Sequence, residues 1–147
     1  MGEYRRGAHT VFEIHLHLVW TTKYRKQVLT GEVPVRVRDL IREICGDHDV
    51  KIMKGHVSKD HVHLLVSIPP QVTISKLMQY LKGKTAHTIM MEFPHIKKHY
   101  WGQHMWARGY FCASVGAVDE DTIKKYIESQ KWDEEDQGFK ITAPTEP

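Results

Sequence analysis

The residues with the clearest potential for chemistry are two histidines separated by one valine, His61 and His63. In a strand, residues i and i+2 point to the same face about 6.5 Å apart, so two imidazoles could bind one metal ion. Two imidazoles do not complete a metal site, and a third ligand must come from elsewhere in the fold. His15 and His17 have the same spacing, so the pattern also fits ordinary surface histidines.

A second pair of candidates, Tyr126 and Gln130, lies near the C-terminus. Residues four apart share one face of a helix, and Ile123 and Ile127 could pack beneath that face. A tyrosine hydroxyl is a candidate nucleophile, and a neutral amide is a candidate metal ligand. The same pattern also fits an amphipathic helix with a half-buried tyrosine.

Hydrophobic periodicity predicts the elements that must position these residues. Strands are predicted over 13–21, 50–57 and 61–68, and a hairpin over 105–116. In the third strand the aliphatic residues alternate with the histidines, so His61 and His63 share the face opposite the core. The stretch 95–106, rich in histidine, lysine and aromatic residues, is predicted to be a loop.

Three helices are predicted between and after these strands. The first runs from Pro34 to about Cys45, the second begins at Thr73 as N-cap and ends at Pro94, and the third covers 119–134. The predicted order of the first six elements is strand, helix, strand, strand, helix, strand. This is the order of a ferredoxin-like split βαβ sheet. We therefore predict an α+β fold, an antiparallel sheet with an added C-terminal helix that carries Tyr126.

Length and composition fit one globular domain. The chain has 147 residues, of which 41% are hydrophobic, and we predict a single domain over 1–137 with a flexible tail over 138–147. A net charge of +3 permits a nucleic-acid partner without requiring one. Two distant cysteines and the lack of a long apolar run predict a cytoplasmic protein that does not enter a membrane.

Four segments, KDHVHLLVSIPP, ISKLMQYLKGKTA, WARGYFCASVG and IKKYIESQ, resemble in this order the single-tyrosine HUH transposases of the insertion-sequence 200/605 family. The opening HLHLVWTTKYRKQVL is also similar, so the resemblance covers about residues 9–132. HUH denotes two histidines around a bulky apolar residue. The resemblance implies that His61, His63 and Gln130 are metal ligands and that Tyr126 is the nucleophile.

The resemblance implies a DNA transposase, a metal-dependent endonuclease and strand transferase for single-stranded DNA at mobile-element ends. The tyrosine would form a 5′-phosphotyrosine intermediate, and a divalent ion, Mg²⁺ or Mn²⁺, would stabilise the charge on the phosphate. The family implies single-stranded DNA with hairpin ends as substrate. It also implies a homodimer in which the tyrosine helix of one subunit completes the site of the other.

Cations beside aromatic rings suit single-stranded DNA, although each such cluster also fits a solvated loop. The candidate DNA contacts are Lys23, Tyr24, Arg25, Lys26, Lys82, Lys84 and Arg108, and a second cluster is Lys97, Lys98, Tyr100, Trp101 and Trp106. His17 is predicted on the face of the His61–His63 pair, as a second-shell residue or DNA contact.

Two other functions remain open from the sequence. One is a domesticated relative that binds or nicks repeat-hairpin DNA, which would keep the same four site residues. The other is a non-catalytic module that binds single-stranded nucleic acid, against which the intact set of candidate ligands and nucleophile counts.

Overall fold

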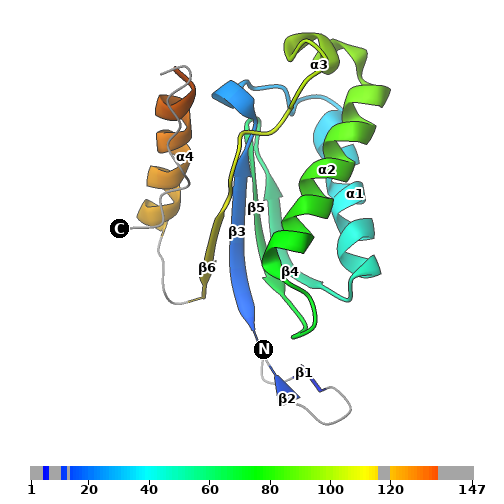
Figure 1. Ribbon diagram of the computed structural model, residues 1–147, viewed down its shortest axis with the longest axis vertical. Helices are drawn as coiled ribbons and strands as arrows, with labels where there is room; N and C mark the ends of the chain where they lie inside the picture. Colours follow the sequence, from blue (N-terminus) through cyan, green and yellow to red (C-terminus); the bar gives the residue numbers. More distant parts are fainter. Residues whose placement is uncertain (1–4, 7–10, 13, 116–119, 136–147) are drawn as a thin grey trace.

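A four-stranded antiparallel sheet forms the centre of the computed structural model, which describes residues 5–6, 11–12, 14–115 and 120–135 (Figure 1). Its strands are β3 (His15–Thr21), β4 (Lys51–Val57), β5 (His61–Ser67) and β6 (Phe111–Ser114), in the order β4-β5-β3-β6. The two strands joined by a tight turn, β4 and β5, are neighbours, and β3 lies between β5 and β6. This is the order of a ferredoxin-like sheet, so the predicted α+β fold is confirmed.

Helices cover both faces of the sheet (Figure 1). On one face lie α1 (Val33–Asp47) and α2 (Ile74–Glu92), and on the other lies α4 (Glu120–Glu135). As predicted, a proline stands in the first turn of α1, and the Thr73 side chain caps α2 by accepting a hydrogen bond from the Lys76 amide at 3.3 Å. Among the helices described, none is long and apolar enough to cross a membrane.

The main core fills the space between the sheet and the helix pair α1–α2. Alternate residues of β3 and β5 enter it, namely Leu16, Leu18, Trp20, Val62, Leu64 and Val66. The three from β5 are aliphatic residues whose alternation predicted an inward face. The histidines of both strands therefore lie on the opposite face of the sheet, which is the face that α4 approaches.

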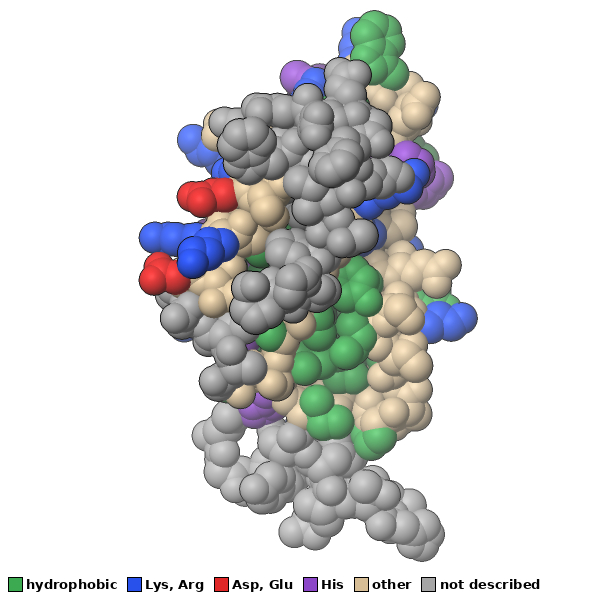
Figure 2. Space-filling view, turned by 60° about the vertical axis from the view of Figure 1, so that its left-hand side comes forward, with side chains coloured by type: hydrophobic (Ala, Val, Ile, Leu, Met, Phe, Trp, Pro, Cys, Tyr) green, Lys and Arg blue, Asp and Glu red, His purple; other side chains and the backbone are tan. Residues whose placement is uncertain are grey.

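The helix α4 packs on that second face through a smaller cluster. Ile123, Tyr126 and Ile127 contact Val19 of β3 and Phe111 of β6, and all five side chains are buried. Figure 2, turned to bring the α4 side of the molecule forward, shows an area of hydrophobic side chains near the middle of this view. Among the described side chains, this cluster packs α4 against β3 and β6, which lie at one end of the sheet.

Two sequence predictions about the segment before β6 were wrong. The expected loop over 95–106 contains the helix α3 (Pro94–His99), in which Pro94 occupies a first-turn position and Ile96 is fully buried. The expected hairpin over 105–116 is not formed, because Trp106 makes a bridge with Thr22 while β6 pairs with β3. Trp106 and β6 thus both pair with the segment formed by β3 and Thr22, and they do not pair with each other.

Three short elements near the N-terminus were not predicted. They are β1 (Arg5–Arg6) paired with β2 (Val11–Phe12), and the 3-10 turn η1 (Lys23–Arg25) that follows β3. The predicted end of the domain at residue 137 and the flexible tail over 138–147 lie outside the described residues.

One lysine ties α2 to the segment that leads into β6. The Lys82 ammonium donates to the carbonyl oxygens of Ala107 at 2.7 Å and Gly109 at 2.9 Å. Burial lowers the pKa of Lys82 to about 8. Nearby, the Trp106 indole donates to the Thr85 hydroxyl at 2.9 Å, so two polar contacts fix this segment against the helix.

Replacing Lys82 with methionine tests how much its hydrogen bonds to the Ala107 and Gly109 carbonyls stabilise the fold. Hydrogen bonds to a charged group are the stronger kind, so we expect Lys82→Met to lower the free energy of unfolding by about 2 kcal/mol, measured by urea denaturation. Lys84→Met, an exposed position two residues along the same helix, should change it by less than about 0.5 kcal/mol. Equal losses in the two variants would show that Lys82 has no special structural role.

Candidate functional site

The two candidate metal ligands lie on the sheet face that α4 approaches. His61 and His63 are half-buried, and they alternate along β5 with buried valine and leucine residues of the main core. In the sheet register His63 lies opposite Val19, which belongs to the cluster under α4. The pair is therefore next to the place where α4 meets the sheet.

His61 contacts the carboxylate of the preceding residue, Asp60. The His61 Nδ1 atom is 2.9 Å from Oδ1 of Asp60, and Oδ2 of Asp60 accepts from Arg25 Nε at 3.0 Å. The hydrogen bond from His61 lowers the pKa of Asp60, and the nearby Arg25 charge adds to this effect against the opposing cost of burial. With Nδ1 engaged by Asp60, Nε2 is the ring nitrogen of His61 that a ligand could use.

The second histidine of the pair contacts His17 across the two strands. His63 Nε2 and His17 Nδ1 are 3.0 Å apart, and the ring centroids are 5.2 Å apart. The structure thus brings His17 to the face where it was predicted to lie and places it directly beside a candidate ligand. One of the two nitrogen atoms must carry a hydrogen for this contact to be a hydrogen bond.

The donor set fits a divalent ion in part. The two imidazoles at alternate positions of β5 are nitrogen donors of a kind that divalent ions accept, and His63 Nε2 is already in contact with His17 Nδ1 at 3.0 Å. Within the described residues, no group of three His, Cys, Asp or Glu side chains is arranged to hold a metal. A complete site therefore needs a further ligand of another type. Gln130 lies in α4 one turn after Tyr126, and its side chain is outside the described part of the structure.

Tyr126, the candidate nucleophile, belongs to α4, and its side chain is buried between this helix and the sheet. Its side chain is 1% exposed, and its ring lies 5.5 Å from the Phe111 ring, measured between centroids. Ile123 and Ile127 pack in the same cluster, as the helical spacing predicted. The structure thus brings Tyr126 to the sheet face that carries His61 and His63, although Tyr126 is far from both histidines in the sequence.

The predicted DNA contacts fall into two groups. The turn η1 presents Tyr24, 51% exposed, with the Lys23 and Lys26 amines 5.5 and 5.9 Å from its ring centroid, and this turn contacts α4. Lys84 and Arg108 are also exposed. Three of these residues use their charged groups within the chain: Arg25 on Asp60, Lys82 on backbone carbonyls, and Lys26 on the His99 carbonyl at 3.1 Å.

Asp60 is the residue of this site that sequence reasoning missed. A signal was present, because histidines that bind metals usually donate their other ring nitrogen to a carboxylate or carbonyl, and Asp60 directly precedes His61. Adjacent residues on a strand point to opposite faces, however, so a direct contact was not expected. Asp60 lies just before β5, where the turn allows its side chain to reach the His61 ring.

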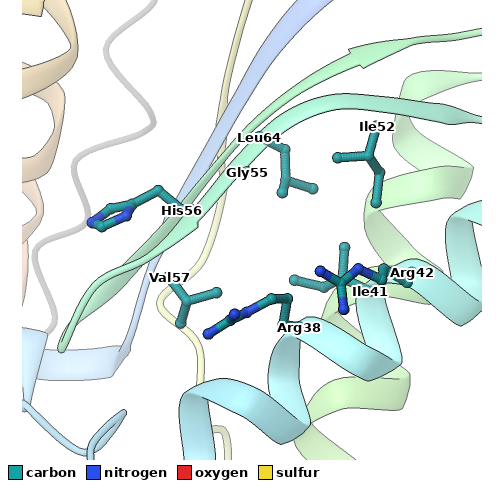
Figure 3. A pocket seen from close by; sticks show the side chains of 8 residues that line it. All are labelled: Arg38, Ile41, Arg42, Ile52, Gly55, His56, Val57 and Leu64. Atoms are coloured by element: carbon teal, nitrogen blue, oxygen red, sulfur yellow. The ribbon is translucent and has the colours of Figure 1, made fainter.

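A separate hollow of about 90 Å³ lies between α1 and β4, on the sheet face away from the His61–His63 pair (Figure 3). Arg38 and Arg42 of α1 line it together with Ile41, Ile52, Gly55, His56, Val57 and Leu64. In Figure 3 the His56 ring points away from the other side chains. The hollow thus opens on the face of the sheet that α1 covers, although one of its lining residues, His56, pairs with His63 in the sheet.

Comparison with known proteins covers nearly all of this chain. Residues 10–130 match the family described as "Transposase IS200 like". The ISDra2 transposase TnpA of Deinococcus radiodurans is 37% identical over 128 residues, which are 87% of this chain and 91% of that protein. The transposase for insertion sequence element IS200 of Salmonella typhimurium is 35% identical over 138 residues, 92% of this chain and 91% of that protein.

Two solved structures share the fold. A crystal structure of a Deinococcus radiodurans R1 protein, described as a candidate transposase, has a TM-score of 0.80 and 35% identity, with 86% of this chain and 97% of that chain covered. A REP-associated tyrosine transposase bound to a REP hairpin has a TM-score of 0.55 and 18% identity, covering 95% of this chain and 81% of that chain, a likeness of fold alone. The family match and the relatives at 35–37% identity place this chain in the IS200-like transposase family, whose activity is DNA transposition.

Proposed function

We propose that this transposase cleaves and rejoins single-stranded DNA at the ends of a mobile element through a covalent bond between Tyr126 and a 5′ phosphate. The observation that carries the proposal is the shared sheet face, where Val19 contacts the Tyr126 cluster and pairs with His63. A nucleophile on a helix and a candidate metal site on the sheet beneath it suit attack on one phosphate.

The proposed reaction exchanges one phosphodiester bond for another. The Tyr126 oxygen attacks the scissile phosphorus as its proton leaves, the bond from phosphorus to the 3′ oxygen breaks, and a free 3′ hydroxyl departs. A second 3′ hydroxyl later attacks the phosphotyrosine, which restores the tyrosine and joins the strands. Because the bond energy is kept in the covalent intermediate, neither step needs ATP.

His61, His63 and Gln130 are the residues we propose to hold a divalent ion, Mg²⁺ or Mn²⁺. Bound there, the ion would supply positive charge to the phosphate oxygens and help to orient them for in-line attack. His17 would support His63 from the neighbouring strand at 3.0 Å. The imidazole donors tilt the preference toward Mn²⁺ in vitro, whereas Mg²⁺ is the more abundant ion in cells.

Tyr126 must become accessible before it can attack, since its side chain is 1% exposed. Among the described side chains, a cluster of five packs α4 against the sheet, and α4 also contacts η1. An identical helix from a second subunit could make the same contacts. We propose a homodimer in which α4 of one subunit completes the site of the other. Because β6 is an edge strand next to α4, this end of the sheet is a suitable dimer surface.

The proposed substrate is single-stranded DNA with hairpin ends. Tyr24 offers a face for base stacking between two lysines, Lys23 and Lys26, and η1 lies against α4 beside the reaction site. Lys84 and Arg108 are exposed cations that could contact phosphates, whereas Arg25 and Lys82 support this surface from inside. The fold neighbour solved with a REP hairpin supports hairpin ends as the DNA element that is bound.

A covalent adduct tests the nucleophile. Incubated with Mn²⁺ and labelled single-stranded DNA from the element ends, the protein should form an adduct that survives denaturing electrophoresis. Tyr126→Phe should abolish the adduct because phenylalanine lacks the attacking oxygen, while Tyr80→Phe, an exposed tyrosine of another helix, should keep it. An adduct in Tyr126→Phe would refute the assignment, and DNA binding with no adduct in any variant would indicate a non-catalytic module.

Removal of metal tests the histidine pair. EDTA should stop cleavage, and excess Mn²⁺ or Mg²⁺ should restore it. His61→Ala or His63→Ala should lower the cleavage rate by at least about 100-fold, since a metal contributes several kcal/mol to such transition states, while DNA binding by gel shift should change little. His87→Ala, an exposed histidine of α2, is the control. Full cleavage in EDTA would exclude this metal site.

Mixing two inactive variants tests the shared site. In a mixed dimer of Tyr126→Phe and His61→Ala subunits, one site has all its residues only if α4 acts on the partner subunit. Random mixing should then restore about a quarter of wild-type cleavage. No recovery, with mixed dimers verified by two affinity tags, would show that each subunit uses its own tyrosine.

A further inference from the structure

A line of contacts joins the turn after β3 to the first histidine of β5. Arg25 Nε donates to Asp60 Oδ2 at 3.0 Å, and Asp60 Oδ1 is 2.9 Å from His61 Nδ1. Both carboxylate oxygens of Asp60 therefore have a partner, one on each side. Asp60 itself is buried, with 7% of its surface exposed, and Arg25 is half-buried.

The backbone around Asp60 is also fixed. The Thr22 amide donates to the Asp60 carbonyl at 2.9 Å, and the Leu29 amide donates to the Lys59 carbonyl at 3.0 Å. The turn before β5 is thus held against the segment after β3 by main-chain bonds as well as by the ion pair. A carboxylate anchored in this way can hold an imidazole ring in one orientation.

The turn η1 contains two residues in the left-handed backbone conformation, which residues other than glycine rarely adopt. Tyr24 has a φ of 61° and Arg25 a φ of 49°, both in the left-handed region, and neither residue is glycine. Such conformations persist only where surrounding contacts impose them, and they are frequent at functional sites. Here the contacts are the Arg25–Asp60 pair and the bond from the Lys23 amide to the Met105 carbonyl at 2.8 Å.

We infer that Asp60, held in place by Arg25, is a positioning residue that fixes the His61 ring with Nδ1–H toward the carboxylate and Nε2 toward the metal. Neither residue touches the reacting phosphate in this arrangement. Arg25 thereby has a role different from the DNA contact predicted for it. This inference rests on the proposed function, because it requires His61 to be a metal ligand.

The inference has two physical consequences. A ring held in one orientation loses less freedom when it binds an ion, and a hydrogen bond to a carboxylate makes the other ring nitrogen a better donor to the metal. In addition, the same ion pair connects the metal site to η1, where Tyr24, Lys23 and Lys26 form the proposed DNA surface. DNA that moves η1 would therefore move Asp60 and, through it, His61.

Metal affinity of the full-length protein tests the inference. With Mn²⁺ titrated by electron paramagnetic resonance, Asp60→Ala should weaken binding by about 10–100-fold, the usual effect of losing such a partner. Arg25→Met should weaken it less, and it should have little further effect in the Asp60→Ala background, because Arg25 acts through Asp60. Asp60→Glu should restore part of the affinity.

The matched control is the exposed ion pair of Arg42 and Asp39 on α1, with 3.5 Å between its charged atoms. Asp39→Ala should leave Mn²⁺ affinity unchanged. Nitrogen-15 NMR of the histidine rings, recorded without metal, should show His61 protonated at Nδ1 in the wild type and redistributed in Asp60→Ala. A purely structural role for Asp60 would leave this tautomer unchanged.

The His61→Ala variant separates the two hypotheses. If His61→Ala retains full Mn²⁺ affinity, the proposed metal site is wrong. If His61→Ala loses the metal while Asp60→Ala keeps wild-type affinity and the Nδ1–H tautomer, the site stands and the role of Asp60 is refuted.

Discussion

The alternation of side chains along β3 and β5 is the constraint on which the rest of this structure depends. On one face, leucine, valine and tryptophan fill the core under α1 and α2, and they fix the register of the two strands. A shift of one residue would bury His61 and His63 and expose the core, so the fold cannot form without presenting the histidines. Stability and the placement of candidate ligands are thus set by the same pairing.

The opposite face carries the candidate site residues, and α4 packs on it through a small cluster. A cluster of five buried side chains holds α4, and the candidate nucleophile is one of them, so Tyr126 contributes to the contact that it must leave in order to react. A helix held by so small a cluster can be displaced, or contributed by another subunit, at less cost than either helix of the main core. The proposed nucleophile is thus buried in this arrangement of α4.

Polar contacts between distant segments support the two candidate histidine ligands. The pairs Arg25–Asp60 and His17–His63 are 35 and 46 residues apart in the sequence. The first orients His61 and the second lies beside His63, so each candidate ligand has a polar partner from another part of the chain. Ligands supported in this way meet an ion at lower entropic cost than flexible surface histidines would.

The sequence by itself determined which residues share a face, because that depends only on the local period of the strand or helix. His61 with His63, the inward face of β5, the cap at Thr73 and the helical spacing of Ile123, Tyr126 and Ile127 could all be predicted in this way. Resemblance to a transposase family then supplied the roles of these residues.

Only the tertiary structure decided which faces meet. Three features depend on contacts between segments and not on local period. They are the packing of α4 on Val19, the contact of Asp60 with His61, and the pairing of Trp106 with Thr22 in place of a hairpin. The period of a strand or helix tells which way its side chains point, but it does not tell which other element those side chains will contact. The helix α3 shows the same limit, because Pro94 ends one helix by its local preference but begins another once Ile96 is buried in the core.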